Sequence, residues 1–226
     1  MTSRPLPPVK GMWSIPVDIK CTESQKEFVE SETRKVLAKL GPGIELPEAH
    51  IEDLHAEWQA VRRVPEEKSA RWTREEQYAE LATDMPDSPV ILYLHGGAYI
   101  VCSIDTHRPL TAKLAEVSNA RVFIVSYRLA PQHQFPAALL DAILAYKYLI
   151  DPPPGALHTA VDPKKIVIAG DSAGVYLSPP LSNLGWFSIC LDGIPRSCSS
   201  SFPITRRHNR NVAMAGLNSF IPFSPK

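Results

Sequence analysis

A serine flanked by glycines follows a short apolar run, in a pattern that can make a serine hydroxyl reactive. Residues 166–170 read Ile-Val-Ile-Ala-Gly and continue into Gly170-Asp171-Ser172-Ala173-Gly174, a G-x-S-x-G sequence. An apolar, β-branched run is typical of a buried strand, and a strand ending in G-x-S-x-G is typical of a nucleophile elbow. On such a turn a base can reach the hydroxyl of Ser172. Gly170 and Gly174 would let the backbone pass close to neighbouring strands.

A second motif could supply the matching oxyanion donors. The apolar run at residues 90–94 leads directly into His95-Gly96-Gly97-Ala98-Tyr99. Acyl transfer requires N–H donors aimed at one oxygen, and a pair of glycines lets the backbone turn close to a substrate. The two motifs together predict an oxyanion hole made by the N–H groups of Gly96, Gly97 and Ala173. Each motif alone also occurs in ordinary turns, but their order and their preceding strands favour catalysis.

The elements around these motifs alternate between strand and helix. Apolar runs predict strands at 90–94, 121–127 and 166–170, and helical spacing predicts helices at 106–118 and 135–150 between them. This order favours right-handed crossovers and a parallel sheet with flanking helices. The expected fold class is therefore α/β.

Residues 1–84 are interpreted as a lead-in followed by a helical region. Residues 1–20 contain four prolines and no periodicity, which favours an extended, poorly ordered segment. Apolar spacing predicts helices at 22–40, at 47–61 and at 72–81. The first and third begin with candidate capping boxes, in which Thr22 is followed by Gln25 and Thr73 by Glu76.

Composition narrows the classes of function. The chain has 226 residues, and Lys+Arg and Asp+Glu both number 24, so the formal net charge is zero. This balance gives no indication of a nucleic acid or an anionic membrane as partner. No apolar run is long enough to span a bilayer and no secretory signal is recognised, so a cytoplasmic location is expected. The cysteines lack metal-ligand spacing, and neither a metal nor a cofactor is predicted.

Four spaced motifs resemble the hormone-sensitive-lipase branch of the α/β-hydrolases, closest to fungal members of the arylacetamide-deacetylase-like kind. They are HGGAY at 95–99, YRLAP at 127–131, FPAALLD at 135–141 and GDSAG at 170–174. The resemblance implies an incomplete α/β-hydrolase fold over residues 85–177. The helices of residues 1–84 would then play the role of that family's N-terminal cap.

The resemblance also implies roles for individual residues. Ser172 would be the nucleophile, and Gly96, Gly97 and Ala173 would form the oxyanion hole. His95 would hold the oxyanion loop in shape. The supporting positions around the elbow, with structural roles, would be Gly170, Asp171 and Gly174. The implied activity is hydrolysis of a small carboxylic ester, with acetyl or short acyl groups, and without a cofactor.

The acid and the base that complete such a site are not recognised. In the family they follow the serine on loops after later strands. Only 54 residues follow Ser172, and they contain one carboxylate, Asp192, and one histidine, His208. Neither follows a predicted strand, so neither is assigned a role. A serine without its base keeps little activity beyond what the oxyanion hole supplies, and the chain is expected to be inactive by itself.

Residues 178–226 are interpreted as an irregular, aberrant tail. Pro179 and Pro180 are expected to stop the helix after the elbow within about two turns. Reading the codons of Ala213-Met214-Ala215 one base later forces a tryptophan, and the surrounding codons then permit the family-like sequence S-P-W-x-D-L. Residues from about 175 onward are therefore expected to come from a retained intron or another gene-model error, followed by frame-shifted coding sequence.

Two alternatives to an esterase remain open. The chain could be a non-catalytic relative that keeps the ligand pocket, as the plant gibberellin receptors do. It could also be a fragment that does not fold stably, because a sheet ending at the elbow strand would expose an apolar edge.

Overall fold

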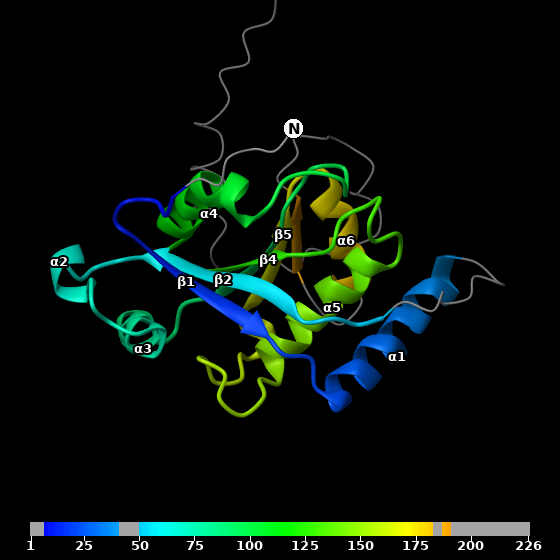
Figure 1. Ribbon diagram of the computed structural model, residues 1–226, viewed down its shortest axis with the longest axis horizontal. Coiled ribbons are helices and arrows are strands. Elements are labelled where there is room, and N and C mark those ends of the chain that lie inside the picture. Colours follow the sequence, from blue (N-terminus) through cyan, green and yellow to red (C-terminus); the bar gives the residue numbers. More distant parts are fainter. Residues whose placement is uncertain (1–6, 41–49, 183–186, 191–226) are drawn as a thin grey trace, which may run out of the picture.

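A six-stranded mixed sheet forms the centre of the protein, with strand order β1-β2-β4-β3-β5-β6 (Figure 1). The computed structural model describes residues 7–40, 50–182 and 187–190.

Three parallel strands in the middle of the sheet carry the motifs. They are β3 (Val90–Leu94), β4 (Arg121–Ser126) and β5 (Ile166–Gly170), and β3 pairs in parallel with both of the others. At the carboxyl end of β3, Leu94 lies beside Val125 on one side and Gly170 on the other. The predicted parallel α/β arrangement is confirmed.

Two hydrophobic clusters cover the two faces of this sheet. On one face, Tyr93 and Ile124 pack with Ile104, Ala112 and Ala115 of α4 (Ile104–Ser118). On the other, alternate strand residues such as Leu92 and Phe123 pack with α5 (Ala137–Ile150), most of whose side chains are buried. The helices predicted at 106–118 and 135–150 are therefore present, and they lie on opposite faces.

Two antiparallel strands extend the sheet where the sequence predicted none. β1 (Met12–Ile19) pairs with β2 (Leu54–Val61), and β2 pairs with β4. The expected lead-in over 1–20 is therefore wrong for β1, and the helix expected at 47–61 is wrong for β2. Both strands alternate buried apolar residues with other residues, as in Trp13, Ile15 and Val17. Pro16 is tolerated because β1 lies at the sheet edge.

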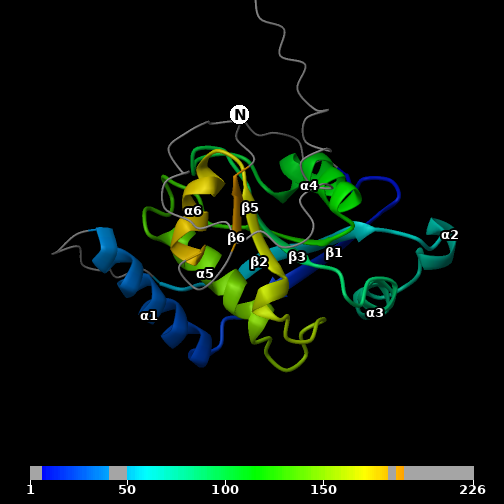
Figure 2. The same cartoon turned by 180° about the vertical axis from the view of Figure 1, so that it is seen from behind.

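The helices before β3 pack against this sheet. α1 (Glu23–Leu40) lies against α5, and α3 (Arg74–Asp84) contacts β1, while α2 (Glu66–Ser69) is a single turn (Figure 2). Both predicted capping boxes are formed. Since β1 and β2 belong to the central sheet, the interpretation of residues 1–84 as a helical cap is wrong for these strands. None of the helices in the described ranges is both long and apolar enough to cross a membrane.

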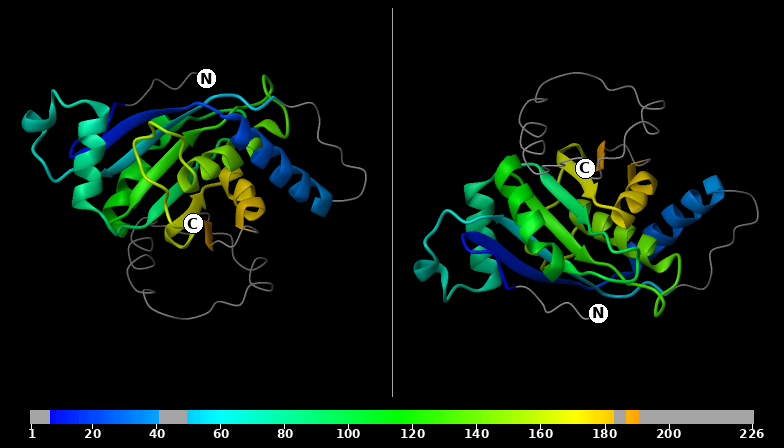
Figure 3. Two further views of the ribbon diagram at one scale, coloured as in Figure 1. Left: turned by 90° about the horizontal axis from the view of Figure 1, so that it is seen from below. Right: turned by 90° about the horizontal axis from the view of Figure 1, so that it is seen from above.

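The segment after the elbow continues further than expected. A short 3₁₀ turn, η1 (Pro163–Lys165), precedes β5, and α6 (Ala173–Ser182) follows it. The helix therefore runs past Pro179 and Pro180, and the predicted stop is wrong by a few residues. β6 (Phe187–Cys190) pairs in parallel with β5, so the elbow strand is not a sheet edge (Figure 3). Residues 191–226, most of the expected aberrant tail, lie outside the described ranges.

Candidate active site

Ser172 occupies a sharp turn between β5 and α6. Its φ is 45°, and the residue is exposed. A positive φ is uncommon for a residue other than glycine, and such strain is found preferentially at functional sites. The structure thus places Ser172 on the kind of strand-to-helix turn that presents a nucleophile at the edge of a sheet.

The two glycines of the elbow lie directly against β3. A Cβ atom at Gly170 would be 2.6 Å from the carbonyl oxygen of Leu94, and a Cβ at Gly174 would overlap the same oxygen. Only glycine therefore allows the turn to approach the end of β3 this closely. This contact brings the elbow next to His95, the residue that follows β3.

The loop after β3 contains a second concentration of strained backbone. Gly97 has a φ of 114°, and Ala98, Tyr99 and Cys102 also have positive φ values. The described part of the chain has five non-glycine residues with positive φ, and four of them are Ser172 and the three loop residues Ala98, Tyr99 and Cys102. The fifth is the helix C-cap of α4. Backbone strain is therefore concentrated at the two predicted halves of one site.

Asp171 joins these two halves. Its Oδ1 accepts hydrogen bonds from the N–H of Gly96 at 2.9 Å and from the hydroxyl of Tyr93 at 2.8 Å, and Nε2 of His107 lies 3.3 Å away. Burial disfavours the charge on Asp171. The hydrogen bonds from His107 and Tyr93, with the charge of His107 and the Gly96 N–H, outweigh burial and lower the pKa of Asp171 to about 2. Asp171 is therefore an ionised anchor for the loop.

This anchor changes the expected set of oxyanion donors. Because the N–H of Gly96 already donates to Asp171, it is not available to an oxyanion in this conformation. The place of Gly96 in the oxyanion hole stays a prediction, and this hydrogen bond favours a supporting role for it instead. Gly97 and Ala173 remain the predicted donors, one from the loop and one from the first turn of α6.

His95 stabilises the same loop from inside the fold. The ring is buried, its Nδ1–H donates to the carbonyl of Gly96 at 2.7 Å, and it stacks on Tyr127 with centroids 4.2 Å apart. The hydroxyl of Tyr127 donates to the carbonyl of His95. Burial lowers the pKa of His95 to about 4. A neutral His95 therefore supports the loop, and Tyr99 ties it to α6 through the carbonyl of Ala173 at 2.8 Å.

The YRLAP motif contributes a buried ion pair. Arg128 donates to both carboxylate oxygens of Asp141, at 2.8–3.0 Å, and Asp141 also accepts from the Arg128 backbone N–H. The same guanidinium bonds Glu52 and the carbonyl of His50, in the segment just before β2. This pair links the end of β4 to α5 and to the approach to β2.

Buried histidines make the fold sensitive to acid. Burial lowers the pKa of both His95 and His158 to about 4, whereas an unfolded histidine titrates near 6.5. Below that value the unfolded state binds more protons, so stability falls as the pH drops toward 4. We expect each histidine to remove about 2 kcal/mol between pH 7 and pH 5. Urea unfolding of wild type and His158→Asn at both pH values tests this, and an identical pH dependence would contradict it.

One further residue of the site was not found from the sequence. His107 lies on α4, outside both motifs, and no spacing pattern connects it to Asp171. Asp192 and His208, by contrast, lie outside the described residues, so the lack of an acid and a base remains a prediction. In the ranges that the structure covers, no three histidine, cysteine or carboxylate side chains gather as metal ligands would.

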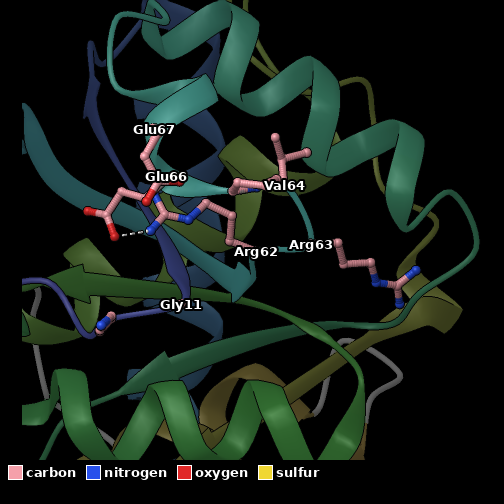
Figure 4. A pocket seen from close by; sticks show the side chains of 8 residues that line it. Gly11, Arg62, Arg63, Val64, Glu66 and Glu67 are labelled. Carbon is pink, nitrogen blue, oxygen red and sulfur yellow. Dashed lines mark ion pairs between the residues drawn. The ribbon is translucent and has the colours of Figure 1, made fainter.

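A hollow on another part of the surface shares no residue with the elbow or its loop. It has a volume of about 320 Å³ and lies where β2 leads into α2 (Figure 4). Arg62 pairs there with Glu66 at 2.7 Å, and Arg63 donates to the carbonyl of Asp84 and to Asn119. These arginines are held by the protein itself, so the elbow remains the candidate site.

One family model matches the segment that carries both motifs. Residues 91–183 match the family model described as an alpha/beta hydrolase fold. The match begins in β3 and ends just after α6, so it contains both motifs.

Named relatives of this segment are esterases. It is 41% identical over 93 residues to an ethyl acetate hydrolase of Pseudomonas putida, covering 41% of this chain and 28% of that protein. It is 39% identical over 92 residues to an acetyl-hydrolase of Streptomyces hygroscopicus, with the same shares covered. A carboxylesterase of Mycobacterium tuberculosis is 38% identical over 96 residues, covering 42% of this chain and 29% of that protein. The chain thus spans less than a third of these relatives.

Proposed function

We propose that Ser172 is the nucleophile of a serine carboxylic-ester hydrolase site. The observation that carries this proposal is the exposed Ser172 at positive φ, held beside the glycine loop by Asp171. The names of the relatives support the same chemistry.

The reaction would proceed through an acyl-serine. Oγ of Ser172 attacks the ester carbonyl carbon while a base takes its proton, and the carbonyl electrons move onto the oxygen. The N–H groups of Gly97 and Ala173 would stabilise this oxyanion. The carbonyl then re-forms as the alcohol leaves with a proton, and water releases the acid by the same steps.

The surroundings favour a small, apolar ester. Ile100 and Val101 of the loop and Tyr176 of α6 are large hydrophobic side chains that remain exposed. Tyr176 follows Ser172 by about one helical turn. Two of the relatives are named for ethyl acetate and acetyl groups, and acetyl or short acyl esters are accordingly the proposed substrates.

We further infer that this chain turns over esters slowly unless a base is added. In His107 and His95, ring nitrogens are committed to Asp171 and to Gly96. A small base such as imidazole can take the place of a missing histidine in general-base catalysis. Added imidazole should therefore reveal the nucleophile.

The test is hydrolysis of p-nitrophenyl acetate by wild type and by Ser172→Ala over a series of imidazole concentrations. The variant corrects for hydrolysis by imidazole itself. We expect a Ser172-dependent rate that rises with imidazole. Equal rates in the two proteins at every concentration would contradict the esterase proposal and favour a non-catalytic, ligand-binding relative. A Ser172-dependent rate without imidazole would contradict only the inferred lack of a base.

A further inference from the structure

His107 lies against the carboxylate of Asp171. Its Nε2 lies 3.3 Å from Oδ1 of Asp171, and the two side chains are 12% and 26% exposed. The ring also lies beside two residues of the site, 5.4 Å from His95 and 6.2 Å from Tyr93 between ring centroids. α4 is thereby connected to the elbow through one side chain.

The hydrogen bonds of the Thr106 hydroxyl indicate the protonation state of the His107 ring. The Thr106 hydroxyl donates to the carbonyl of Ser103 at 2.8 Å and accepts from the Ser103 N–H at 3.0 Å. A hydroxyl has one proton to donate, so with that proton on the Ser103 carbonyl, Nδ1 of His107, 2.9 Å from the same oxygen, is placed to donate. Nε2 faces a carboxylate and must donate as well. With both ring nitrogens donating, His107 would be an imidazolium.

The carboxylate that His107 pairs with is in direct contact with the loop. A Cβ atom on Gly96 would overlap Oδ2 of Asp171, while the Gly96 N–H donates to Oδ1. A shift of Asp171 would therefore move Gly96, and with it the adjoining N–H of Gly97. The other ionisable groups facing this pair include Tyr93, which donates to Asp171, His95, which burial keeps neutral, and Tyr127, which stacks on His95.

We propose that His107, as an imidazolium, is a positioning residue that holds Asp171 and thereby sets the place of the oxyanion loop beside Ser172. Its catalytic consequence rests on the proposed esterase function. His107 touches no reacting atom in this role. It acts through Asp171 and Gly96.

NMR of the full chain labelled with ¹⁵N in glycine and histidine tests the link without requiring turnover. At pH 6 we expect both ring nitrogens of His107 to carry a proton and the Gly96 amide proton to lie downfield, as expected for an N–H bound to a carboxylate. The Gly96 resonance should move upfield in His107→Gln. It should stay in place in the control His133→Gln, which alters an exposed loop residue. Asp171→Asn assigns the Gly96 resonance.

Kinetics supply the second readout. A misplacement of about 1 Å at a reacting site can cost about a hundredfold in rate. We therefore expect His107→Gln to lower the imidazole-dependent kcat on p-nitrophenyl acetate by about tenfold to a hundredfold, with little change in KM. The control His133→Gln should leave this kcat unchanged.

The outcomes separate the two proposals. A His107 ring nitrogen without a proton, or an unmoved Gly96 resonance in His107→Gln, would overturn the positioning role. So would an unchanged kcat in His107→Gln. If the NMR result is as expected but the wild type shows no Ser172-dependent turnover, only the esterase function is contradicted.

Discussion

Replacing Asp141 with alanine is expected to lower the free energy of unfolding by about 3–5 kcal/mol. The carboxylate is buried and accepts four hydrogen bonds from Arg128. Its removal leaves the Arg128 guanidinium with only Glu52 and the carbonyl of His50 as partners, and removing one partner of a buried pair costs far more than the intact pair contributes. Urea unfolding of the two proteins measures the difference.

An exposed ion pair provides the matched control. Lys165 and Asp87 are 3.1 Å apart at the surface, and Asp87→Ala should cost less than about 1 kcal/mol. The double variant Arg128→Met with Asp141→Leu should recover much of the stability lost in Asp141→Ala, because no buried charge remains. A loss no greater in Asp141→Ala than in Asp87→Ala would show that the buried pair is unimportant.

Replacing Gly174 with alanine is expected to cost about 3 kcal/mol or more. The added Cβ would overlap the carbonyl oxygen of Leu94, and a backbone oxygen at the end of a central strand cannot move aside as a flexible side chain can. Relief of the clash requires the elbow to separate from β3, which would also move Ser172 away from the glycine loop. Both the unfolding free energy and Ser172-dependent turnover should therefore fall.

Gly155 separates this effect from the general cost of replacing a glycine. It has a φ of 87°, but an added Cβ would have no atom within 4 Å, so Gly155→Ala should cost only about 1–2 kcal/mol from backbone strain. If Gly155→Ala and Gly174→Ala lower the free energy of unfolding by similar amounts, the contact between the elbow and β3 has room for a Cβ and the explanation is wrong.

The sequence predicted the centre of the fold because the local and long-range preferences agree there. Val90–Leu94 and Ile166–Gly170 are short apolar runs buried on both faces, and each ends in glycine-containing turns. Helical spacing between them is equally clear. No competing pattern fits these segments, so their structure could be predicted without knowledge of their partners.

The first two strands were missed because two periodicities overlap in them. In β2, Leu54, Trp58 and Val61 fit helical spacing, but Ala56, Trp58 and Ala60 also alternate with Glu57 and Gln59. Glu57 and Gln59 of β2 are nevertheless buried, and Glu57 pairs with Arg108 of α4 at 2.7 Å. Pairing with β1 and β4 decided the outcome, and no local pattern contains that information.

The site was predictable where residues adjoin in sequence, and unpredictable where they meet only in space. The motif residues around Ser172 and Gly97 could be read directly. The hydrogen bond from Gly96 to Asp171, which engages one predicted oxyanion donor, depends on the packing of two loops. The approach of His107 depends on the placement of α4 across the sheet.

Covalent labelling of Ser172 tests the central claim most directly. A fluorophosphonate reacts with an activated serine by forming a P–O bond and releasing fluoride, and it leaves a stable adduct that resembles the oxyanion intermediate. In the presence of imidazole we expect one adduct, located at Ser172 by peptide mass spectrometry and absent from Ser172→Ala. An unlabelled Ser172, or equal labelling of wild type and Ser172→Ala, would contradict the account.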